Sequence, residues 1–315
     1  MASVQTGRAA ENSVFDVASL TKIATATQIL MLADDQKLDL RAPIGYYLSE
    51  ISGDAFLNER LRDVTLEKLL THTSSLVDWY PFYSRYGEDF YAVLSFVLHH
   101  TEPAEGVKYS DLNFMLLGKL LERVNGLPLE QCLKEKLVDP LHLGKMTYRP
   151  PESWDIIPSC YDNSIEMDMC RARNIPFDHF RPAGVEVRGT TNDGNAHYFF
   201  HDVSGHAGIF AEPQAYERLC QFYMNTPSPF LLRAQQEQPF SPSRGLGLET
   251  GTAYPYGCGH TGFTGTSIYF SREKNIGVVA FTNRLFYPTG NPNATNLYRR
   301  ALHEAVLTIR EMFTE

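Results

Sequence analysis

The sequence predicts an α/β architecture of the α+β type, in which an antiparallel sheet flanked by helices is joined to a helical lobe. Two observations predict it. β-rich runs are confined to the last quarter of the chain, at 266–270 and 276–282, and the polar turn between them makes a hairpin. Helical periodicity dominates before residue 225 and returns as an amphipathic helix over 296–313. We therefore expect the two ends of the chain to meet around the sheet.

The first predicted helix covers 18–33, where apolar residues spaced by three and four fall close to one face: Ile23, Ala26, Leu30 and Ala33. The polar run 34–37 ends it, and Pro43 breaks the loop that follows. A short helix is expected over 64–71, with Thr65 as its N-cap.

Further helices are predicted over 90–99, 112–125, 129–137 and 216–224, and Gly126 ends the second of these. The stretch 149–202 is rich in Pro, Asn, Asp and isolated aromatic residues. We expect a long irregular excursion there, which in a compact domain is more often functional than idle.

We interpret residues 1–315 as a single domain made of two lobes. The sheet lobe is expected to come from roughly 1–35 and 245–315, and the helical lobe from 36–244. A cleft between lobes is a usual place for a binding site.

Composition excludes several classes of protein. The net charge is −9 and the basic residues form no run, so a nucleic-acid partner is not expected. No apolar stretch is long enough for a membrane-spanning helix. The first eleven residues hold no apolar run, so no secretory signal is visible. The protein is expected in the cytoplasm if this N-terminus is the natural one, and outside it if an upstream signal is missing.

The cysteine and histidine patterns do not predict a metal site. The five cysteines are odd in number and no pair has two-residue spacing, which favours buried free thiols over disulfides or zinc. His197 and His201 have the spacing of a metal pair, but no glutamate follows His197 and the region is irregular. We expect local hydrogen bonding for these two.

Ser19 and Lys22 are three residues apart at the start of the first helix, so they share a face and the lysine amine can reach the hydroxyl. A serine becomes a nucleophile when a base takes its proton. A lysine serves as that base when burial or nearby positive charge lowers its pKa. The same spacing is common on surface helices, so the motif alone does not decide.

Two further patterns would complete a catalytic group. Tyr109 precedes Ser110 and Asp111 at the head of an apolar helix, and a tyrosine beside a lysine can accept or relay a proton. The run 260–262 (His-Thr-Gly) leads into the hairpin, where glycine lets a strand approach a ligand. The amides of Ser19 and Phe263 would then form an oxyanion hole. Taken singly, the first pattern also fits a helix cap with a core tyrosine, and the second a plain loop.

Together and in this order, these motifs resemble the set found in β-lactamases and penicillin-binding proteins. Six segments carry the resemblance to class C β-lactamases and their relatives, from about Val14 to the C-terminus: FDVASLTKIATATQILML, LEKLLTHTSSL, VKYSDLNFMLLGKLLERVNG, VDPLHLGKMTY, VSGHAGIFAEP and CGHTGFTGTSIYF with GVVAFTNR. The resemblance implies a β-lactamase/transpeptidase-like fold.

The resemblance also implies roles. Ser19 is the acylated nucleophile, Lys22 helps to deprotonate it, and Tyr109 is the general base and later the proton donor to the leaving group. His260 stands in the place of the usual lysine, orders the site and is a candidate contact for a substrate carboxylate. The amides of Ser19 and Phe263 hold the oxyanion. The family needs no metal and no cofactor.

Three departures from the family pattern matter. Asp111 stands where the family most often has Asn, which puts an acceptor where an amide usually donates to substrate. His260 in place of Lys is expected to titrate near neutrality. Only eighteen residues precede Ser19, where relatives usually have a helix and two strands. We therefore expect missing N-terminal strands, an open sheet edge and self-association through it.

The predicted function is that of a serine hydrolase, a DD-peptidase or esterase, acting through an acyl-enzyme on D-alanyl-D-alanine peptides, β-lactams or small esters. Asp111, His260, Thr261, Gly262 and Phe263 are the predicted substrate-binding residues. The alternative is a non-catalytic binding or sensor protein that keeps the site.

Overall fold

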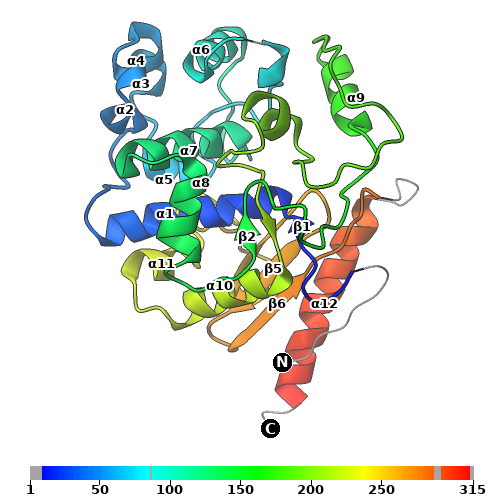
Figure 1. Ribbon diagram of the computed structural model, residues 1–315. Helices are drawn as coiled ribbons and strands as arrows, with labels where there is room; N and C mark the ends of the chain where they lie inside the picture. The colour runs from blue at the N-terminus through cyan, green and yellow to red at the C-terminus, as the bar shows by residue number, and fades with distance from the viewer. Residues whose placement is uncertain (1–8, 86, 287–291, 313–315) are drawn as a thin grey trace.

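The computed structural model describes residues 9–85, 87–286 and 292–312, and Figure 1 shows helices gathered around one long central helix, with a small sheet at one side. The central helix, α1 (Thr21–Asp34), follows a 3₁₀ turn, η1 (Ala18–Leu20). It packs against α7 (Asp111–Asn125) and α11 (Pro229–Ala234). Because neighbours surround it, α1 is buried on nearly all sides rather than on the one face that periodicity predicted.

The other helices between residues 44 and 133 are mostly short. They are α2 (Ile44–Tyr47), α3 (Ser49–Ser52), α4 (Ala55–Leu61), α5 (Leu66–Leu70), α6 (Phe90–His100) and α8 (Leu129–Leu133), with a 3₁₀ turn at Phe82–Ser84 and a π turn at Lys134–Val138 after α8. Thr65 caps α5 by accepting a hydrogen bond from the Lys68 amide over 3.2 Å, as predicted. Gly126 ends α7 with a left-handed φ of 64°, also as predicted.

The excursion 149–202 is not wholly irregular. It contains helix α9 (Ser164–Ala172) and a π turn at Asn195–Phe199. Only Glu166 and Cys170 of α9 are buried. Because one of these two buried residues is a carboxylic acid, the buried face of α9 does not show the helical spacing of apolar residues by which a helix is predicted from sequence.

The predicted hairpin is confirmed, and a third strand joins it. Strands β4 (Cys258–Thr261), β5 (Ser267–Ser271) and β6 (Ile276–Ala280) form an antiparallel sheet in the order β4-β5-β6. In register, Thr261 lies opposite Ser267, and Ser271 lies opposite Ile276. No strand was predicted at β4, because its four residues carry little apolar signal.

Helices cover both faces of this sheet. Ile268 and Phe270 of β5 belong to the main core, which includes residues of α10 (Pro213–Asn225). Tyr269 points the other way and packs with Leu307 of α12 (Pro292–Met312). Helix α10 lies within the range expected for the helical lobe but covers the sheet (Figure 1).

The N-terminal strand joins a second sheet. β1 (Phe15–Asp16) pairs antiparallel with β3 (Phe210–Ala211), which also pairs with β2 (Met146–Thr147). The sheet lobe was also expected to include residues 1–8, which lie outside the described residues. Within the described chain, no strand pairs with the outer edge of β6.

All five cysteines are free and buried, as predicted: Cys132, Cys160, Cys170, Cys220 and Cys258. In the part of the chain that the structure describes, no helix combines the length and apolar character needed to cross a bilayer.

Candidate active site

Ser19 lies in a tight turn between β1 and α1. Ala18, just before it, adopts a left-handed φ of 48°, which is costly for a residue with a Cβ. Asp16 holds this turn by accepting a hydrogen bond from the Ala18 amide over 2.8 Å. The turn presents Ser19 at the beginning of α1, partly exposed.

Lys22 is fully buried beside Ser19, and its ammonium has an acceptor for each of its three protons. Nζ lies 3.0 Å from Ser19 Oγ, 2.8 Å from Asp111 Oδ1 and 3.0 Å from the carbonyl oxygen of His206. Burial disfavours the charged form, but Asp111 and Tyr109 outweigh it, so the pKa of Lys22 is raised above its ordinary value. The predicted contact with Ser19 is confirmed, whereas a lysine with a lowered pKa is not what the resting site contains.

Tyr109 stands over Lys22, with 5.1 Å between its ring centroid and Nζ. Burial raises the pKa of the Tyr109 hydroxyl, and the Lys22 charge and hydrogen bonding to Lys22 and Ser19 only partly oppose this. Both groups are therefore protonated in the resting site near neutral pH. The pair must lose one proton before either member can act as a base.

Asp111 begins α7 and directs its carboxylate to Lys22, so this acceptor is engaged by the protein rather than waiting for substrate. His72 fixes the start of the same helix. Its Nδ1 accepts from the Ser110 amide over 3.0 Å and lies 3.1 Å from Asn113 Nδ2. Burial, helped by nearby cations, holds the pKa of His72 well below its usual range, which keeps the ring a neutral acceptor.

His260 lies on β4, almost fully buried, with its ring centroid 6.0 Å from that of Tyr109. Burial is the main cause that lowers the pKa of His260 to about 4, although Glu249 opposes it. The expectation of a histidine that titrates near neutrality is therefore wrong. At pH 7 this ring brings no charge to the site.

Arg244 supplies a positive charge that sequence reasoning missed. Its guanidinium lies 5.4 Å from the Tyr109 ring centroid and 3.2 Å from Glu249 Oε1. The side chain is 17% exposed, so solvent reaches it. It also contributes to the lowered pKa of His260.

The turn after β4 comes close to the nucleophile. A Cβ on Gly262 would stand 2.5 Å from the Val17 carbonyl oxygen, so only glycine permits this approach. Phe263 follows with its side chain 42% exposed and its ring under the Arg284 guanidinium, 4.8 Å from the centroid. Among the described residues the Phe263 amide donates to no protein acceptor, and its part in an oxyanion hole stays a prediction.

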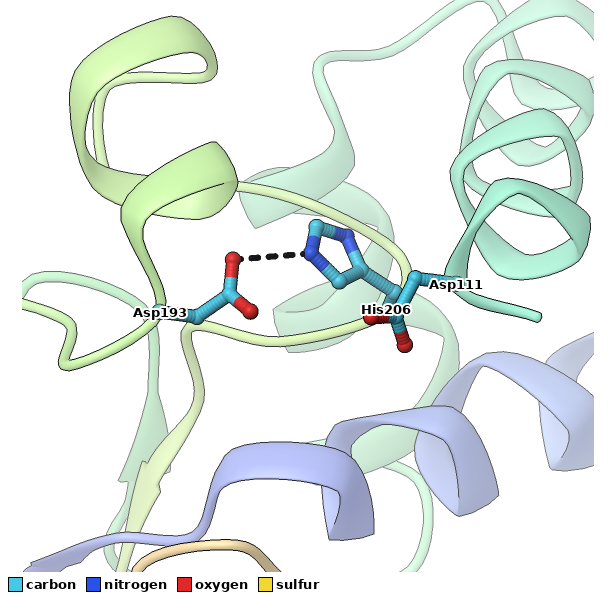
Figure 2. A group of neighbouring side chains, drawn as sticks. All are labelled: Asp111, Asp193 and His206. Atoms are coloured by element: carbon cyan, nitrogen blue, oxygen red, sulfur yellow. Dashed lines mark hydrogen bonds and ion pairs between the residues drawn. The ribbon is translucent and has the colours of Figure 1, made fainter. Parts of the chain in front are cut away.

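A second group of side chains borders Lys22. Figure 2 shows Asp193 and His206, which come from two loops, near Asp111 at the start of α7. His206 Nε2 lies 2.9 Å from Asp193 Oδ1, and His206 Nδ1 lies 2.7 Å from Ser204 Oγ. The imidazole is therefore held at both nitrogens.

Two carboxylates and an imidazole are donors that a divalent cation accepts, and here they lie within 4.8 Å of one another. Lys22 already satisfies Asp111, and His206 already satisfies Asp193. A divalent cation would also stand beside the buried Lys22 charge, which repels it. The group fits a hydrogen-bonded network better than a metal site.

The other histidine pair does not converge. His197 Nδ1 bonds to Asp202 Oδ1 over 2.8 Å, whereas His201 lies beyond the π turn and is exposed. His197 thus has the local hydrogen bond that the sequence analysis expected.

Comparison with known proteins adds a family to this geometry. The family model described as Beta-lactamase matches residues 1–303. The chain is 25% identical over 314 residues to an N-acetylmuramyl-L-alanine amidase of Bacillus subtilis, covering 89% of this chain and 70% of the relative. It is also 25% identical over 323 residues to a putative D-alanyl-D-alanine carboxypeptidase of Salmonella paratyphi B, covering 90% and 72%.

Solved structures share the fold. The octameric penicillin-binding protein homologue of Pyrococcus abyssi has a TM-score of 0.65 at 18% identity, covering 93% of this chain and 66% of that chain. The β-lactamase/D-alanine carboxypeptidase of Yersinia pestis has a TM-score of 0.62 at 21% identity, covering 94% and 85%.

Proposed function

Since the chain belongs to the β-lactamase family and is a hydrolase of that kind, we propose that it acts as a serine hydrolase through an acyl-enzyme on Ser19. One observation carries this proposal. The Ser19 hydroxyl lies 3.0 Å from a buried lysine, in a group that also contains Tyr109. Nucleophile and base within hydrogen-bond reach are the arrangement that covalent catalysis requires.

The proposed reaction begins when the Tyr109–Lys22 pair has lost one proton. Ser19 Oγ then attacks the carbonyl carbon of the substrate, and its proton passes to Tyr109. Tyr109 returns a proton to the leaving group as the acyl bond to Ser19 forms and the old bond breaks. A water molecule repeats these steps and releases the acid. Lys22 remains the charge that stabilises the tyrosinate.

We propose a substrate with a carboxylate beside the scissile amide, as D-alanyl-D-alanine peptides and β-lactams both have. Arg244 supports this choice, because its guanidinium, which is paired with Glu249, lies close to Tyr109 and is partly exposed. The relatives named as an amidase and a carboxypeptidase support amide cleavage. Small esters remain useful probes, since they test acylation without needing a carboxylate contact.

Covalent labelling tests the proposal. The protein is incubated with a fluorescent penicillin, an activated ester and a fluorophosphonate, and the modified peptide is mapped by mass spectrometry. We expect an adduct on the peptide containing Ser19 that is lost in Ser19→Ala. Ser52→Ala, an exposed serine on α3, is the matched control and should label normally.

A folded protein that takes no label from any of the three reagents would contradict the enzyme proposal and favour the binding-protein alternative. The raised pKa of both Lys22 and Tyr109 is the observation behind that alternative, because both side chains are protonated at neutral pH. Labelling that survives in Ser19→Ala would show that the nucleophile is another residue.

A further inference from the structure

The third acceptor of the Lys22 ammonium is a backbone carbonyl, that of His206, and it lies in the irregular loop 203–209 before β3. Loop carbonyls are usually less well fixed than those of helices and strands. This one orients the group that bonds to the Ser19 hydroxyl. What holds the loop therefore bears on the proposed reaction.

The loop is held by close packing against α7 and α1. A Cβ on Gly205 would stand 2.2 Å from the Phe114 carbonyl oxygen, so only glycine allows this approach. Thr25 of α1 donates to the Gly205 carbonyl over 2.8 Å. These contacts fix the distance between the loop and the two helices. Neither contact involves the peptide bond between His206 and Ala207, which carries the carbonyl that faces Lys22.

The His206 imidazole supplies the missing constraint. The ring is fully buried and is bonded at both nitrogens, by Ser204 in its own loop and by Asp193 in another. With the ring held at both nitrogens, the Cα of His206 is restrained, which limits how far its carbonyl can turn away from Lys22.

Asp193 is itself anchored. Its Oδ1 accepts from the Ala196 amide over 2.8 Å. The residues on either side of it are bonded to buried carboxyl groups: the Asn192 amide donates to Asp16 over 2.6 Å, and the Gly194 amide donates to Glu166 over 3.0 Å. The segment that carries Asp193 is thus fixed to β1 and to α9.

We propose that Asp193 and His206 are positioning residues for Lys22, and that they hold the His206 carbonyl as the third acceptor of its ammonium. This proposal rests on the proposed serine hydrolase function. Neither residue touches the reacting atoms. Without the hydrogen bonds that hold the His206 ring, the Lys22 ammonium would keep only two fixed acceptors, Ser19 and Asp111. It could then rotate, and its hydrogen bond to Ser19 would be less well aligned.

Kinetics of the full-length protein test this role. His206→Ala and Asp193→Ala are compared with the wild type using p-nitrophenyl acetate, with rates divided by the number of sites that a penicillin label titrates. We expect kcat to fall about 10- to 100-fold, as for a misplaced catalytic group, while KM changes less than about twofold. A structural role alone would lower the number of titratable sites and leave kcat per site unchanged.

Two comparisons sharpen the result. His206→Gln keeps a side-chain N–H for Asp193 and should recover most of the lost rate. His303→Ala is the matched control, because His303 is also a buried histidine but belongs to α12, where its Nδ1 is bonded to the Ala253 carbonyl. It should keep the wild-type kcat. If His206→Ala does not fold, Asp193→Ala, at a partly exposed position, decides the matter.

A second experiment, which does not depend on enzyme activity, uses NMR of protein labelled with ¹⁵N-lysine. A buried, triply bonded ammonium should give a slowly exchanging Nζ signal for Lys22, assigned by its loss in Lys22→Arg, which keeps a charged partner for Asp111. We expect that signal to shift and broaden in Asp193→Ala and His206→Ala but not in His303→Ala. An unchanged signal, or an unchanged kcat per site, overturns the proposal. If wild-type Ser19 takes no label, the proposed function fails, and the NMR result alone decides this inference.

Discussion

Asp111 sets the protonation state of Lys22. Its carboxylate lies 2.8 Å from Nζ and raises the pKa of the lysine, so the Tyr109–Lys22 pair loses its proton only under alkaline conditions. In Asp111→Asn this attraction is gone and the pKa of Lys22 falls. The rise of kcat/KM with pH should therefore move to lower pH, and activity at pH 7 should increase about tenfold for each unit of the shift.

Profiles of kcat/KM against pH for an activated ester check this expectation. Asp78→Asn is the control, since Asp78 is a surface carboxylate near the site that pairs with Lys108 instead. A profile for Asp111→Asn that coincides with the wild type would show that Asp111 does not control the pair. Lys22→Ala is a poor probe, because it leaves Asp111 without its partner and is expected to cost about 3–5 kcal/mol of stability.

Arg244, rather than His260, is expected to select substrates that carry a carboxylate. Because the pKa of His260 is lowered to about 4, its charge is constant between pH 5 and 8. The ratio of kcat/KM for an anionic to a neutral substrate should therefore stay flat over that range. Arg244→Gln should lower the ratio roughly 10- to 150-fold, the worth of a charge-assisted hydrogen bond of about 1.5–3 kcal/mol.

The exposed Arg62→Gln is the matched control for charge. If the ratio of kcat/KM for the anionic and neutral substrates falls as the pH rises through 6–7, His260 rather than Arg244 binds the carboxylate. If Arg244→Gln leaves this ratio unchanged, Arg244 does not bind the substrate carboxylate.

At this scale, sequence reasoning succeeded where residues are close along the chain. Spacing alone predicted the contact between Ser19 and Lys22, because a helix turn brings such residues together. Arg244 and His206 reach the site on loops far from Ser19 in sequence. His206 lies in the segment VSGHAGIFAEP, which resembles the family but gave this residue no role, and no local pattern marks Arg244. The pKa of His260 depends on burial, which a sequence does not state.

Among the elements, the β1–α1 turn depends on a buried acid. Asp16 is 2% exposed, and its carboxylate accepts from the Ala18 and Asn192 amides. Burial raises the pKa of Asp16 to about 6, although those two hydrogen bonds oppose it. Its ordinary pKa is about 3.9, so the folded state favours the protonated acid.

The contribution of Asp16 to the free energy of unfolding should therefore be fully present below about pH 4. It should be lost as the pH rises from about 4 to about 6. The full contribution is about 3 kcal/mol. Urea unfolding of wild type and Asp16→Asn between pH 4 and 7 checks this, because the difference in unfolding free energy between the two should change over that interval. A constant difference would show that Asp16 does not titrate there.

Other elements show where patterns suffice. The β5–β6 hairpin was predicted because β-rich runs flank a polar turn. Helix α9 was missed because Glu166, an ionisable residue, occupies a buried position where the apolar period needed a hydrophobic one. β4 was missed because its four residues, Cys-Gly-His-Thr, carry little apolar signal although most of them are buried.

For the whole molecule, the described sheet leaves β6 as an outer strand, and α12, which packs on it, exposes four large apolar side chains: Leu297, Tyr298, Ile309 and Met312. Open edges and exposed apolar surface both favour pairing with another chain. We expect this protein to self-associate, with sedimentation coefficients that rise with concentration.

Replacing Leu297 and Ile309 together by Glu should weaken the association, because charges oppose burial of that helix face. Tyr46→Glu is the control, since Tyr46 is 79% exposed on α2, away from the sheet. A monodisperse monomer at high concentration, or equal association of both variants, would contradict the expectation.

The buried thiols have a practical consequence for studying this chain. Burial raises the pKa of all five cysteines, so none offers a thiolate to solvent in the folded protein. A maleimide dye should therefore find no anchor on the native chain, and a single cysteine placed at the exposed position of Ser52 would carry the dye alone. Fluorescence from that one position could follow individual molecules without first removing any natural cysteine.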